Sequence, residues 1–293
     1  MTNRERAHLR AGLLFVAPWL TGLALLIALP TAMTVYYSFC DYSVLKEPVF
    51  IGLANYKDLA KDPVFLKSLW NTGFFAFFAL PLGTLFAIFL AILLNQDIPA
   101  RPVFRTIFFL PSLVPLVALA ILWQWMFNGR FGVINHGLSK LGVDGPNWLG
   151  DTTWAKPALI AMGLWGVGHA VVIYLAGLQD IPKSLYEAAR VDGADWWQQT
   201  RHVTLPMLSP VIYFNLLMGC IGVLQVFAVP YIMTGGGPAR STLFLTMYLY
   251  DQAFVYLNMG YACAMALVLF ALIAGLTFAA HKLAGRHVVY GGN

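Results

Sequence analysis

The residues best suited to chemistry lie in a polar stretch, 179–206, that separates two long apolar runs of this 293-residue chain. Helix-forming residues precede Gly193, which predicts a short helix that ends at a turn, and Pro206 is expected to open the next apolar helix. The chemistry that this pattern suits is the docking of a partner at a membrane surface. The residues that we single out for it are Glu187, Ala188, Ala189, Asp192, Gly193, Leu205 and Pro206.

Glu187 is expected at the start of the short helix, where the helix dipole favours a carboxylate. We expect this carboxylate to be the polar contact with the partner, although a charge at that place could also do no more than stabilise the helix. Apolar residues of the same helix are expected to form a knob that enters a cleft on the partner, because buried aromatic anchors dominate many interfaces. These residues are Ala188, Ala189, Val191, Trp196 and Trp197.

No pattern in the sequence predicts catalysis. A G-x-x-x-x-G-K-[ST] loop, which holds nucleotide phosphates, does not occur, so we do not expect the chain to hydrolyse ATP itself. His169 and Ser209 are the nearest candidates for an intramembrane protease, but no nucleophile elbow or H-E-x-x-H pattern supports them. Cys40, Cys220 and Cys263 have no paired spacing, and we therefore expect neither a disulfide framework nor a metal site.

The charged residues serve as rulers for membrane-spanning segments, because a charge at the bilayer centre costs several kcal/mol and an apolar helix of about 20 residues spans the bilayer. All 13 acidic and all 18 basic residues fall outside six long charge-free intervals. With 59% hydrophobic and 11% charged residues, the composition excludes an ordinary soluble core. The intervals are 11–40, 68–96, 106–129, 157–179, 202–239 and 252–281.

Helices are expected in these intervals, because each exceeds the roughly ten residues of a transmembrane strand and none alternates apolar with polar residues. The sequence therefore predicts an all-α polytopic membrane protein with six transmembrane helices in one domain, 1–293. The expected spans are 12–36, 69–94, 106–127, 157–178, 207–229 and 258–281.

The distribution of lysine and arginine predicts the orientation of these spans. The two terminal segments, the loop 95–105 and the polar stretch hold ten basic residues in 62 positions, whereas the other three loops hold eight in 89. We therefore expect both termini and the polar stretch in the cytoplasm. This pattern also explains the net charge of +5 better than nucleic-acid binding does, since the basic residues form no clustered stripe.

The first apolar run is expected to remain as a span rather than to be removed as a secretory signal. Its apolar part, 11–32, exceeds the 7 to 15 residues of a signal h-region, and it continues without a convincing cleavage site.

Polar side chains inside the spans are candidates for a translocation path, because such groups usually face the interior of a helix bundle. Trp165 and His169 lie one helical turn apart in the fourth span, and Asn215 and Gln225 lie nearly three turns apart in the fifth. Amides and aromatic rings suit sugar hydroxyls and stacking. A single histidine in an apolar span can equally serve as a hydrogen-bonding group between helices.

The spacing of the polar stretch resembles the EAA loop of ABC importer permeases, with Glu-Ala-Ala, three residues, glycine, nine residues, Val203, one residue and Leu-Pro. Two further segments are similar to permeases of the carbohydrate-uptake type. One is Phe50-Ile-Gly-Leu-Ala-Asn-Tyr56, followed by Asp62, Phe65 and Asn71-Thr72. The other is Thr234-Gly-Gly-Gly-Pro238 with Ser241-Thr242, then Tyr250, Ala253-Phe254 and Gly260-Tyr261-Ala262, similar to the permease subunit of maltose and glycerol-3-phosphate importers that carries a TGGGP loop.

This resemblance covers nearly the whole chain and implies the type I ABC importer permease fold in a bacterial or archaeal inner membrane. It implies a non-catalytic subunit that moves a sugar, oligosaccharide, polyol or sugar-phosphate-like solute by alternating access. The implied partners are a second homologous permease subunit, two ATPase subunits with ATP and magnesium, and an extracytoplasmic binding protein, besides the lipid bilayer. No cofactor on this chain and no nucleic acid are expected.

The alternative is a secondary transporter or channel that works alone. Such proteins often place a carboxylate or lysine within the membrane to couple ions, and the six intervals contain none.

Overall fold

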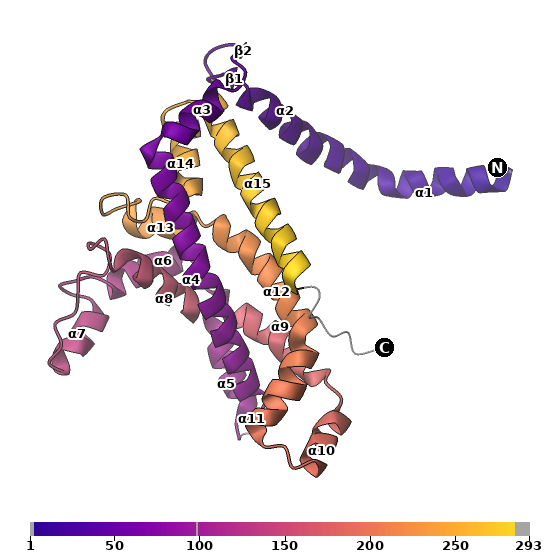
Figure 1. The fold of residues 1–293 in the computed structure, drawn as a ribbon, viewed down its shortest axis with the longest axis vertical. Helices are drawn as coiled ribbons and strands as arrows, with labels where there is room; N and C mark the ends of the chain where they lie inside the picture. Colours follow the sequence, from indigo (N-terminus) through magenta and orange to yellow (C-terminus); the bar gives the residue numbers. More distant parts are fainter. Residues whose placement is uncertain (1–2, 98, 285–293) are drawn as a thin grey trace. The chain divides into compact units, whose positions relative to one another are not determined.

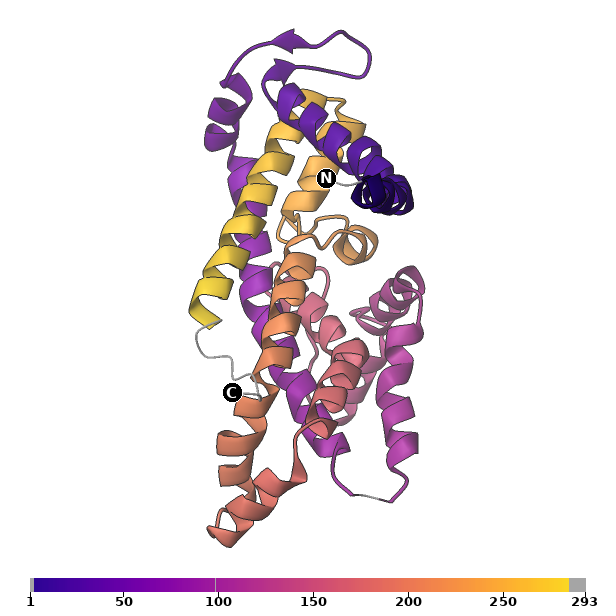
Figure 2. The same cartoon turned by 90° about the vertical axis from the view of Figure 1, so that its right-hand side faces the viewer.

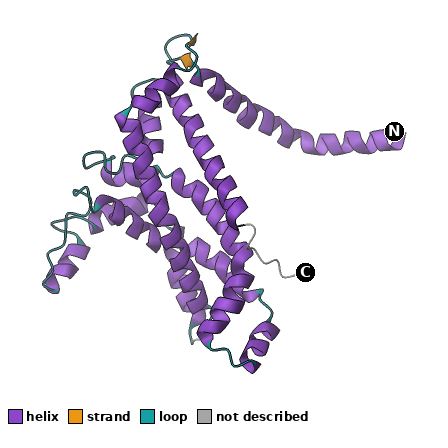
Figure 3. Cartoon of the chain, in the orientation of Figure 1, coloured by secondary structure: helices purple, strands orange, loops and turns teal. Residues whose placement is uncertain are grey.

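The computed structural model describes residues 3–97 and 99–284, and most of these residues are helical (Figure 3). In this part of the chain, two short antiparallel strands, β1 (Cys40–Asp41) and β2 (Val49–Phe50), form the only sheet. The chain divides into two compact units. Figure 1 labels the elements that make them up. Unit 1 consists of residues 1–62 and 249–271, and unit 2 of residues 63–248 and 272–293.

Helices that could cross a membrane occupy each of the six charge-free intervals. Four described helices are long and apolar enough by themselves, namely Gly12–Ser38, Pro63–Leu94, Trp196–Leu224 and Met259–Lys282. Two further pairs reach the required length only together: Arg101–Leu113 with Leu116–Met126, bent by 97°, and Ala155–Trp165 with Gly168–Gln179, bent by 47°. The expected all-α architecture is confirmed.

Prolines explain the sharper of the two bends. The helix α5 (Arg101–Phe109) runs into a 3₁₀ turn, η2 (Leu110–Leu113), and α6 (Leu116–Met126) starts after Pro115. Val114 precedes this proline and has extended backbone angles, as the clash with a proline ring requires. The pair is therefore one apolar segment broken in its middle.

Unit 1 begins with α1 (Asn3–Gly22), the π-helical turn η1 (Leu23–Ala28) and α2 (Leu29–Ser38), which continue one another. The strands and α3 (Ala54–Lys61) follow. Later in the sequence, η4 (Asp251–Val255) and the first part of α15 (Met259–Ala284) complete this unit.

A polar joint holds unit 1 together. The buried Asn55 amide donates to the carbonyl oxygens of Ser38 and Cys40 at 2.9 and 3.0 Å. Tyr261 donates from its hydroxyl to the Asp62 carboxylate at 2.8 Å. The Gly260 N–H donates to the carbonyl oxygen of Tyr42 at 3.0 Å, so the start of α15 is fixed to the segment after α2.

Unit 2 is built around α4 (Pro63–Leu94), which packs against α8 (Ala155–Trp165), α9 (Gly168–Gln179) and α12 (Leu205–Leu224). Its core includes Tyr174 and Leu208, whose side chains are 1% and 0% exposed. The helices α9 and α12 approach closely at Gly177, where a Cβ atom would lie only 2.8 Å from Val211. The remaining elements are α7 (Val133–Lys140), α10 (Lys183–Val191), α11 (Trp196–Gln199), η3 (Thr200–Thr204) and α13 (Ala228–Thr234), and α14 (Leu245–Tyr250) ends in unit 1.

A second polar joint ties α4 to the glycine-rich loop after α13. Asn71 is fully buried and donates to the carbonyl oxygens of Arg240 and Leu243. The neighbouring Thr72 hydroxyl accepts a hydrogen bond from the Leu245 N–H at 2.9 Å. These bonds give the Asn71-Thr72 pair and the loop around 234–242 a shared structural role.

Candidate coupling loop and translocation path

The polar stretch forms a short helix, α10, that ends at a glycine turn. Pro182 precedes the helix with extended backbone angles, and Asp192 follows it. Gly193 then adopts φ +78°, a conformation that glycine enters without the steric cost of a Cβ atom. The predicted helix and turn are therefore present where the sequence placed them.

Glu187 lies elsewhere than expected within this helix. Because α10 begins at Lys183, the Glu187 carboxylate lies in the middle of the helix and not in its first turn. The prediction that the helix dipole favours it there is wrong, since this effect fades beyond the first turn. The side chain is exposed and belongs to no ion pair in the described part of the chain, so its carboxylate is available to a partner.

Backbone hydrogen bonds fix the turn at Gly193. The Gly193 N–H donates to the carbonyl oxygen of Arg190 at 3.0 Å, and the Ala194 N–H donates to that of Ala189 at 2.9 Å. No heavy atom beyond its chain neighbours lies within 4 Å of the position that a Gly193 Cβ would occupy. The need for glycine therefore comes from the backbone conformation and not from crowding.

The two tryptophans stand on a separate helix, α11, which corrects the expectation of one helix carrying the whole knob. Asp195 caps this helix by accepting from the Gln198 N–H at 2.7 Å, while the Gln198 side chain accepts from the Asp195 N–H at 2.8 Å. This reciprocal capping box starts a second helix after the turn at Gly193. Trp196 and Trp197 are consequently held at the first two positions of α11.

Three large apolar side chains of this loop are exposed. Val191 is 88% exposed, Trp196 56% and Trp197 63%. We call these three residues the apolar knob. Exposed apolar groups grouped on one polar loop indicate an interaction site.

The helix after the turn starts earlier than the sequence suggested. We expected Pro206 to be the first residue of this helix. The structure instead shows one continuous helix from Trp196 to Leu224, with Pro206 within it. The π-helical turn η3 precedes this proline and widens the backbone where the proline contributes no N–H. Trp196 and Trp197 of the apolar knob therefore stand at the start of the continuous helix that runs through the core of unit 2, whereas Val191 stands on α10 before the turn.

One brace in this loop was not expected from the sequence. The Tyr186 hydroxyl of α10 hydrogen-bonds the Thr204 hydroxyl at 3.0 Å, between residues 18 positions apart. Tyr186 also packs against the core cluster that contains Leu208. No periodicity in the sequence pairs these two residues, because the turn that brings them together depends on the Gly193 backbone.

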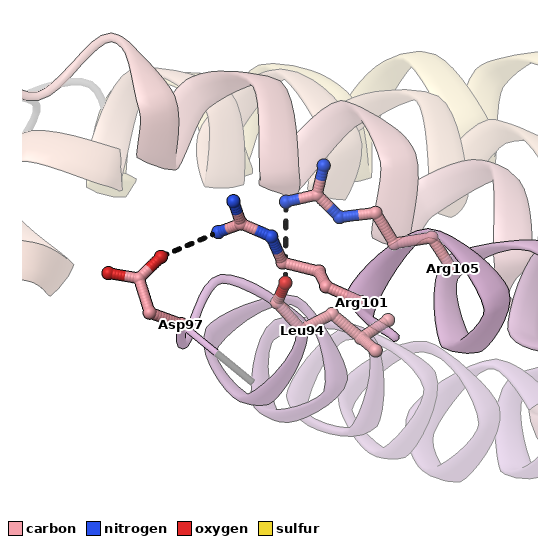
Figure 4. A network of polar contacts seen from close by, with 4 residues as sticks. All are labelled: Leu94, Asp97, Arg101 and Arg105. Carbon is pink, nitrogen blue, oxygen red and sulfur yellow. Dashed lines mark hydrogen bonds and ion pairs between the residues drawn. The ribbon is translucent and has the colours of Figure 1, made fainter. Parts of the chain in front are cut away.

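A second cationic loop lies at the same end of unit 2 as α10 and α11 (Figures 1 and 2). Arg101 pairs with Asp97 at 3.1 Å, and the Arg105 guanidinium donates to the carbonyl oxygen of Leu94 at 3.3 Å (Figure 4). Arg105 therefore supplies a partner for a carbonyl group at the end of α4, where helix carbonyls lack partners within the helix.

The proposed path residues of the fourth span fall on two helices. Trp165 ends α8 and His169 lies in α9, with a break at Gly166 and Val167 between them. The expectation that they lie one turn apart on a single helix is wrong for this reason. Trp165 contacts Trp123 with ring centroids 5.9 Å apart, and His169 contacts Phe109 at 5.4 Å.

The two polar residues of the fifth span do not meet this pair. The Asn215 amide donates to Val211 one turn earlier in its own helix, at 3.0 Å, and Gln225 caps the end of α12. Among the described residues, no hydrogen bond or ring contact joins either of them to Trp165 or His169. The part of the chain that the structure describes also contains no group of three His, Cys, Asp or Glu residues that could hold a metal ion.

Comparison with known proteins agrees with this architecture. Residues 83–288 match the model of the binding-protein-dependent transport system inner membrane component family. The chain belongs to this family. Over 285 residues it is 37% identical to the probable ABC transporter permease protein YesP of Bacillus subtilis, covering 96% of this chain and 92% of that protein.

Two further relatives carry names that state a cargo. The sulfoquinovosyl glycerol transport system permease protein SmoG of Agrobacterium fabrum is 37% identical, covering 88% of this chain and 85% of that protein. The lactose transport system permease protein LacF of Rhizobium radiobacter is 36% identical, covering 91% of both chains.

A solved structure confirms the fold. A chain of a bacterial ABC transporter involved in the import of the acidic polysaccharide alginate matches with a TM-score of 0.84 at 24% identity, covering 97% of this chain and 99% of that chain. The protein is thus a multi-pass membrane permease with the fold of an ABC importer subunit, as the EAA-like spacing predicted.

Proposed function

We propose that this chain is the membrane-spanning subunit of an ATP-driven, binding-protein-dependent importer of carbohydrate. The observation that carries the cargo class is the identity of 35 to 37%, along about nine tenths of the chain, to permeases named for sulfoquinovosyl glycerol, trehalose and maltose, and lactose. The cargo is a sugar, an oligosaccharide, a polyol or a sugar-phosphate-like solute.

Energy enters through the coupling loop, 179–206. The apolar knob inserts into a cleft on an ATPase subunit, and the Glu187 carboxylate, exposed on α10, adds a polar contact at its rim. Ala188, Ala189, Asp192 and Gly193 give the loop its helix and turn, while Leu205 and Pro206 join it to the spanning helix. A displacement of Trp196 and Trp197 is passed on to the spanning helix, because α11, η3 and α12 are continuous.

The coupling loop faces the cytoplasm in this proposal, and so do both termini. The helices α10 and α11 lie at the same end of unit 2 as the start of α5 (Figures 1 and 2). The coupling loop carries Lys183, Arg190 and Arg201, the loop 95–105 carries two further arginines, and a concentration of basic residues marks the cytoplasmic side of a membrane protein. The membrane is the inner membrane of a bacterium or archaeon.

A second homologous permease subunit completes the path. The helix Gly12–Ser38 buries none of the side chains in its most apolar window, whereas the corresponding windows of the other three long helices bury 11 to 28% of theirs. Such an apolar helix requires lipid or another subunit around it. Two ATPase subunits bind ATP and magnesium, and an extracytoplasmic binding protein delivers the cargo.

Transport proceeds by alternating access between the two permease subunits. Trp165, His169, Asn215 and Gln225 line the path in this proposal. The breaks beside Trp165 and Gln225 place all of these residues except Asn215 at helix ends. Broken helices of this kind commonly surround the substrate sites of transporters.

The decisive experiment measures ATP hydrolysis by the complex, purified with its neighbouring gene products and reconstituted in lipid. Binding proteins loaded with lactose, maltose or trehalose are added one at a time. Stimulation of hydrolysis and uptake of the same sugar supports the proposal. Uptake by this chain alone, with no copurifying ATPase, contradicts it and favours a secondary transporter.

A further inference from the structure

Residues 128–150 form a hairpin between α6 and α8, and it lies apart from the coupling loop (Figures 1 and 2). The apolar pair Ala155–Gln179 separates the two in sequence. When this pair is one span, the hairpin lies on the membrane face opposite the coupling loop, which is the extracytoplasmic face in the proposed orientation.

One asparagine holds the two arms of this hairpin together. Asn135 is 9% exposed and donates to the carbonyl oxygens of Gly129, Gly145 and Pro146 at 3.0, 3.3 and 3.0 Å. Its side-chain oxygen accepts from the Trp148 indole N–H at 2.6 Å. The side chain therefore ties the start of the hairpin to its return arm.

Asn135 packs tightly against Gly145, which leaves no space for a side chain at position 145. A Cβ atom on Gly145 would lie 2.1 Å from the Asn135 side-chain oxygen. Phe127, which is 3% exposed, packs on Trp148 with ring centroids 5.7 Å apart, and Trp148 packs on Trp154 at 5.2 Å. The hairpin is thus a fixed element anchored to the end of α6.

A cavity of about 440 Å³ opens on this rigid base. This volume falls within the range of about 300 to 1,000 Å³ that is usual for small-molecule sites. Asn135 is one of its lining residues, and the other side chains that line it are Arg130, Phe131, His136, Ser139 and Asp144.

The lining groups combine hydrogen bonding with one apolar face. Arg130 offers only donors, Asp144 only acceptors when ionised, and the Ser139 hydroxyl offers both. Phe131 is 79% exposed, and its ring stacks on no other aromatic ring in the described residues. An Asx turn fixes this corner, since the Asn128 side-chain oxygen accepts from the backbone N–H groups of Arg130 and Phe131 at 3.0 and 2.9 Å.

We propose that this cavity is an extracytoplasmic carbohydrate subsite of the permease, separate from the translocation path. A pyranose ring carries hydroxyl groups that both donate and accept, and it has an apolar face of C–H bonds that packs on an aromatic ring. Asp144 and Arg130 bind the hydroxyl groups, while Phe131 covers the apolar face. The proposal rests on the proposed carbohydrate cargo, and the subsite retains sugar near the path after the binding protein opens.

The test uses the whole reconstituted complex without binding protein. Lactose, maltose, trehalose and D-glucuronate are titrated separately, and binding is followed by saturation-transfer difference NMR. We expect saturable binding of at least one sugar. Phe131→Ala and Asp144→Asn should each weaken it by about fivefold or more, because one removes the stacking face and the other a charged acceptor.

Leu141→Ala is the matched control. Leu141 lies on the same hairpin, is also 79% exposed and does not line the cavity, so its removal should leave sugar binding unchanged. Copurification of all subunits shows that each variant still assembles.

Three results would overturn the subsite. Binding to Phe131→Ala and Asp144→Asn with wild-type affinity excludes it, as does the absence of saturable binding with all four sugars. Unchanged sugar binding, together with loss of stimulation by the loaded binding protein, shows that the hairpin docks that protein instead. Failure of the proposed function gives a different result, because no sugar-loaded binding protein then stimulates ATP hydrolysis even in the wild-type complex.

Discussion

The Asn71 side-chain amide donates a hydrogen bond to the backbone carbonyl of Leu243 at 3.0 Å and so joins segments separated by 172 residues. The same amide donates to the carbonyl of Arg240 at 2.8 Å, while its oxygen accepts from the Lys156 ammonium at 3.0 Å. Lys156 also lies 4.7 Å from the centroid of the Phe74 ring. One fully buried asparagine therefore connects α4, α8 and the loop before α14.

Replacing this residue should destabilise unit 2. Asn71→Ala leaves two carbonyl groups and an ammonium without their partner. The bond to the Leu243 carbonyl is buried, and a buried polar group left unpaired costs about 1–3 kcal/mol. We expect a lower thermal unfolding temperature of the purified complex, measured by intrinsic fluorescence. Asn95→Ala is the control, since the Asn95 side chain makes no hydrogen bond among the described residues, and equal unfolding temperatures for the two variants would contradict the role of Asn71.

Adding a single methyl group at Gly260 should also destabilise the protein. A Cβ atom there would lie 2.0 Å from the carbonyl oxygen of Cys40, which is too close for any contact. Gly260→Ala is expected to destabilise unit 1 by about 1–3 kcal/mol through overpacking. The yield of assembled complex and its unfolding temperature measure this effect.

The control for Gly260 lies in the same helix. Gly275 has no atom within 4 Å of its would-be Cβ, so Gly275→Ala should be neutral or slightly stabilising. Assembly of Gly260→Ala with wild-type yield and stability would mean that the joint at Cys40 can open without cost.

Both joints show what the sequence could and could not predict. Charge-free intervals located the apolar segments, because the cost of a charge in the bilayer acts on every residue of a span. The sequence segments around Asn55 and Asn71 indicated a family, but the sequence did not predict which contacts these two side chains make. Asn55 donates hydrogen bonds to backbone carbonyls at and just after the end of α2, and Asn71 donates to carbonyls of the loop before α14. Both contacts join segments far apart in the sequence, so they depend on tertiary structure.

In the coupling loop, too, some features could be predicted from the sequence and others could not. Gly193 could be placed at a turn because glycine adopts a positive φ without the steric cost that a Cβ atom brings, and this followed from local chemistry. The sequence placed Glu187 in the first turn of the helix, whereas the helix begins four residues earlier, after Pro182. No sequence signal favours Pro182 over later positions as the residue before the helix. The capping box at Asp195 and Gln198 was available as a signal, since it has the spacing of a helix start.

Gly193 is the most direct test of coupling. Gly193→Trp forces a bulky side chain into a backbone with φ +78° and places it beside the apolar knob. We expect uptake to fall about tenfold or more while the complex remains in the membrane and continues to hydrolyse ATP. Parallel assays of sugar uptake and phosphate release in proteoliposomes measure the amount of sugar taken up per ATP hydrolysed.

Gly142→Trp is the matched control for this variant. Gly142 has φ +76° and equally open surroundings, but it lies on the hairpin away from the coupling loop. It bears the same backbone strain, so a fall in uptake per ATP with Gly193→Trp alone assigns the effect to the loop. Equal ratios in both variants would remove Gly193 from the coupling proposal.

The brace between Tyr186 and Thr204 gives the last prediction, because it links α10 to the continuous helix that runs through unit 2 at a hydroxyl distance of 3.0 Å. Tyr186→Phe and Thr204→Val each remove one hydroxyl and keep the shape of the side chain. In a double-mutant cycle, we expect a coupling energy of about 0.5–1.5 kcal/mol in the stability of the complex.

The same variants distinguish a brace that transmits motion from one that only stabilises the fold. If motion of α10 reaches α12 through this bond, either single variant lowers sugar uptake per ATP hydrolysed, and the double variant lowers it no further. Since α11 and η3 also connect the knob to α12 along the backbone, the expected loss is partial, about two- to fivefold. A stability loss with an unchanged ratio of uptake to hydrolysis would limit the brace to a structural role and leave the continuous helix as the sole mechanical link.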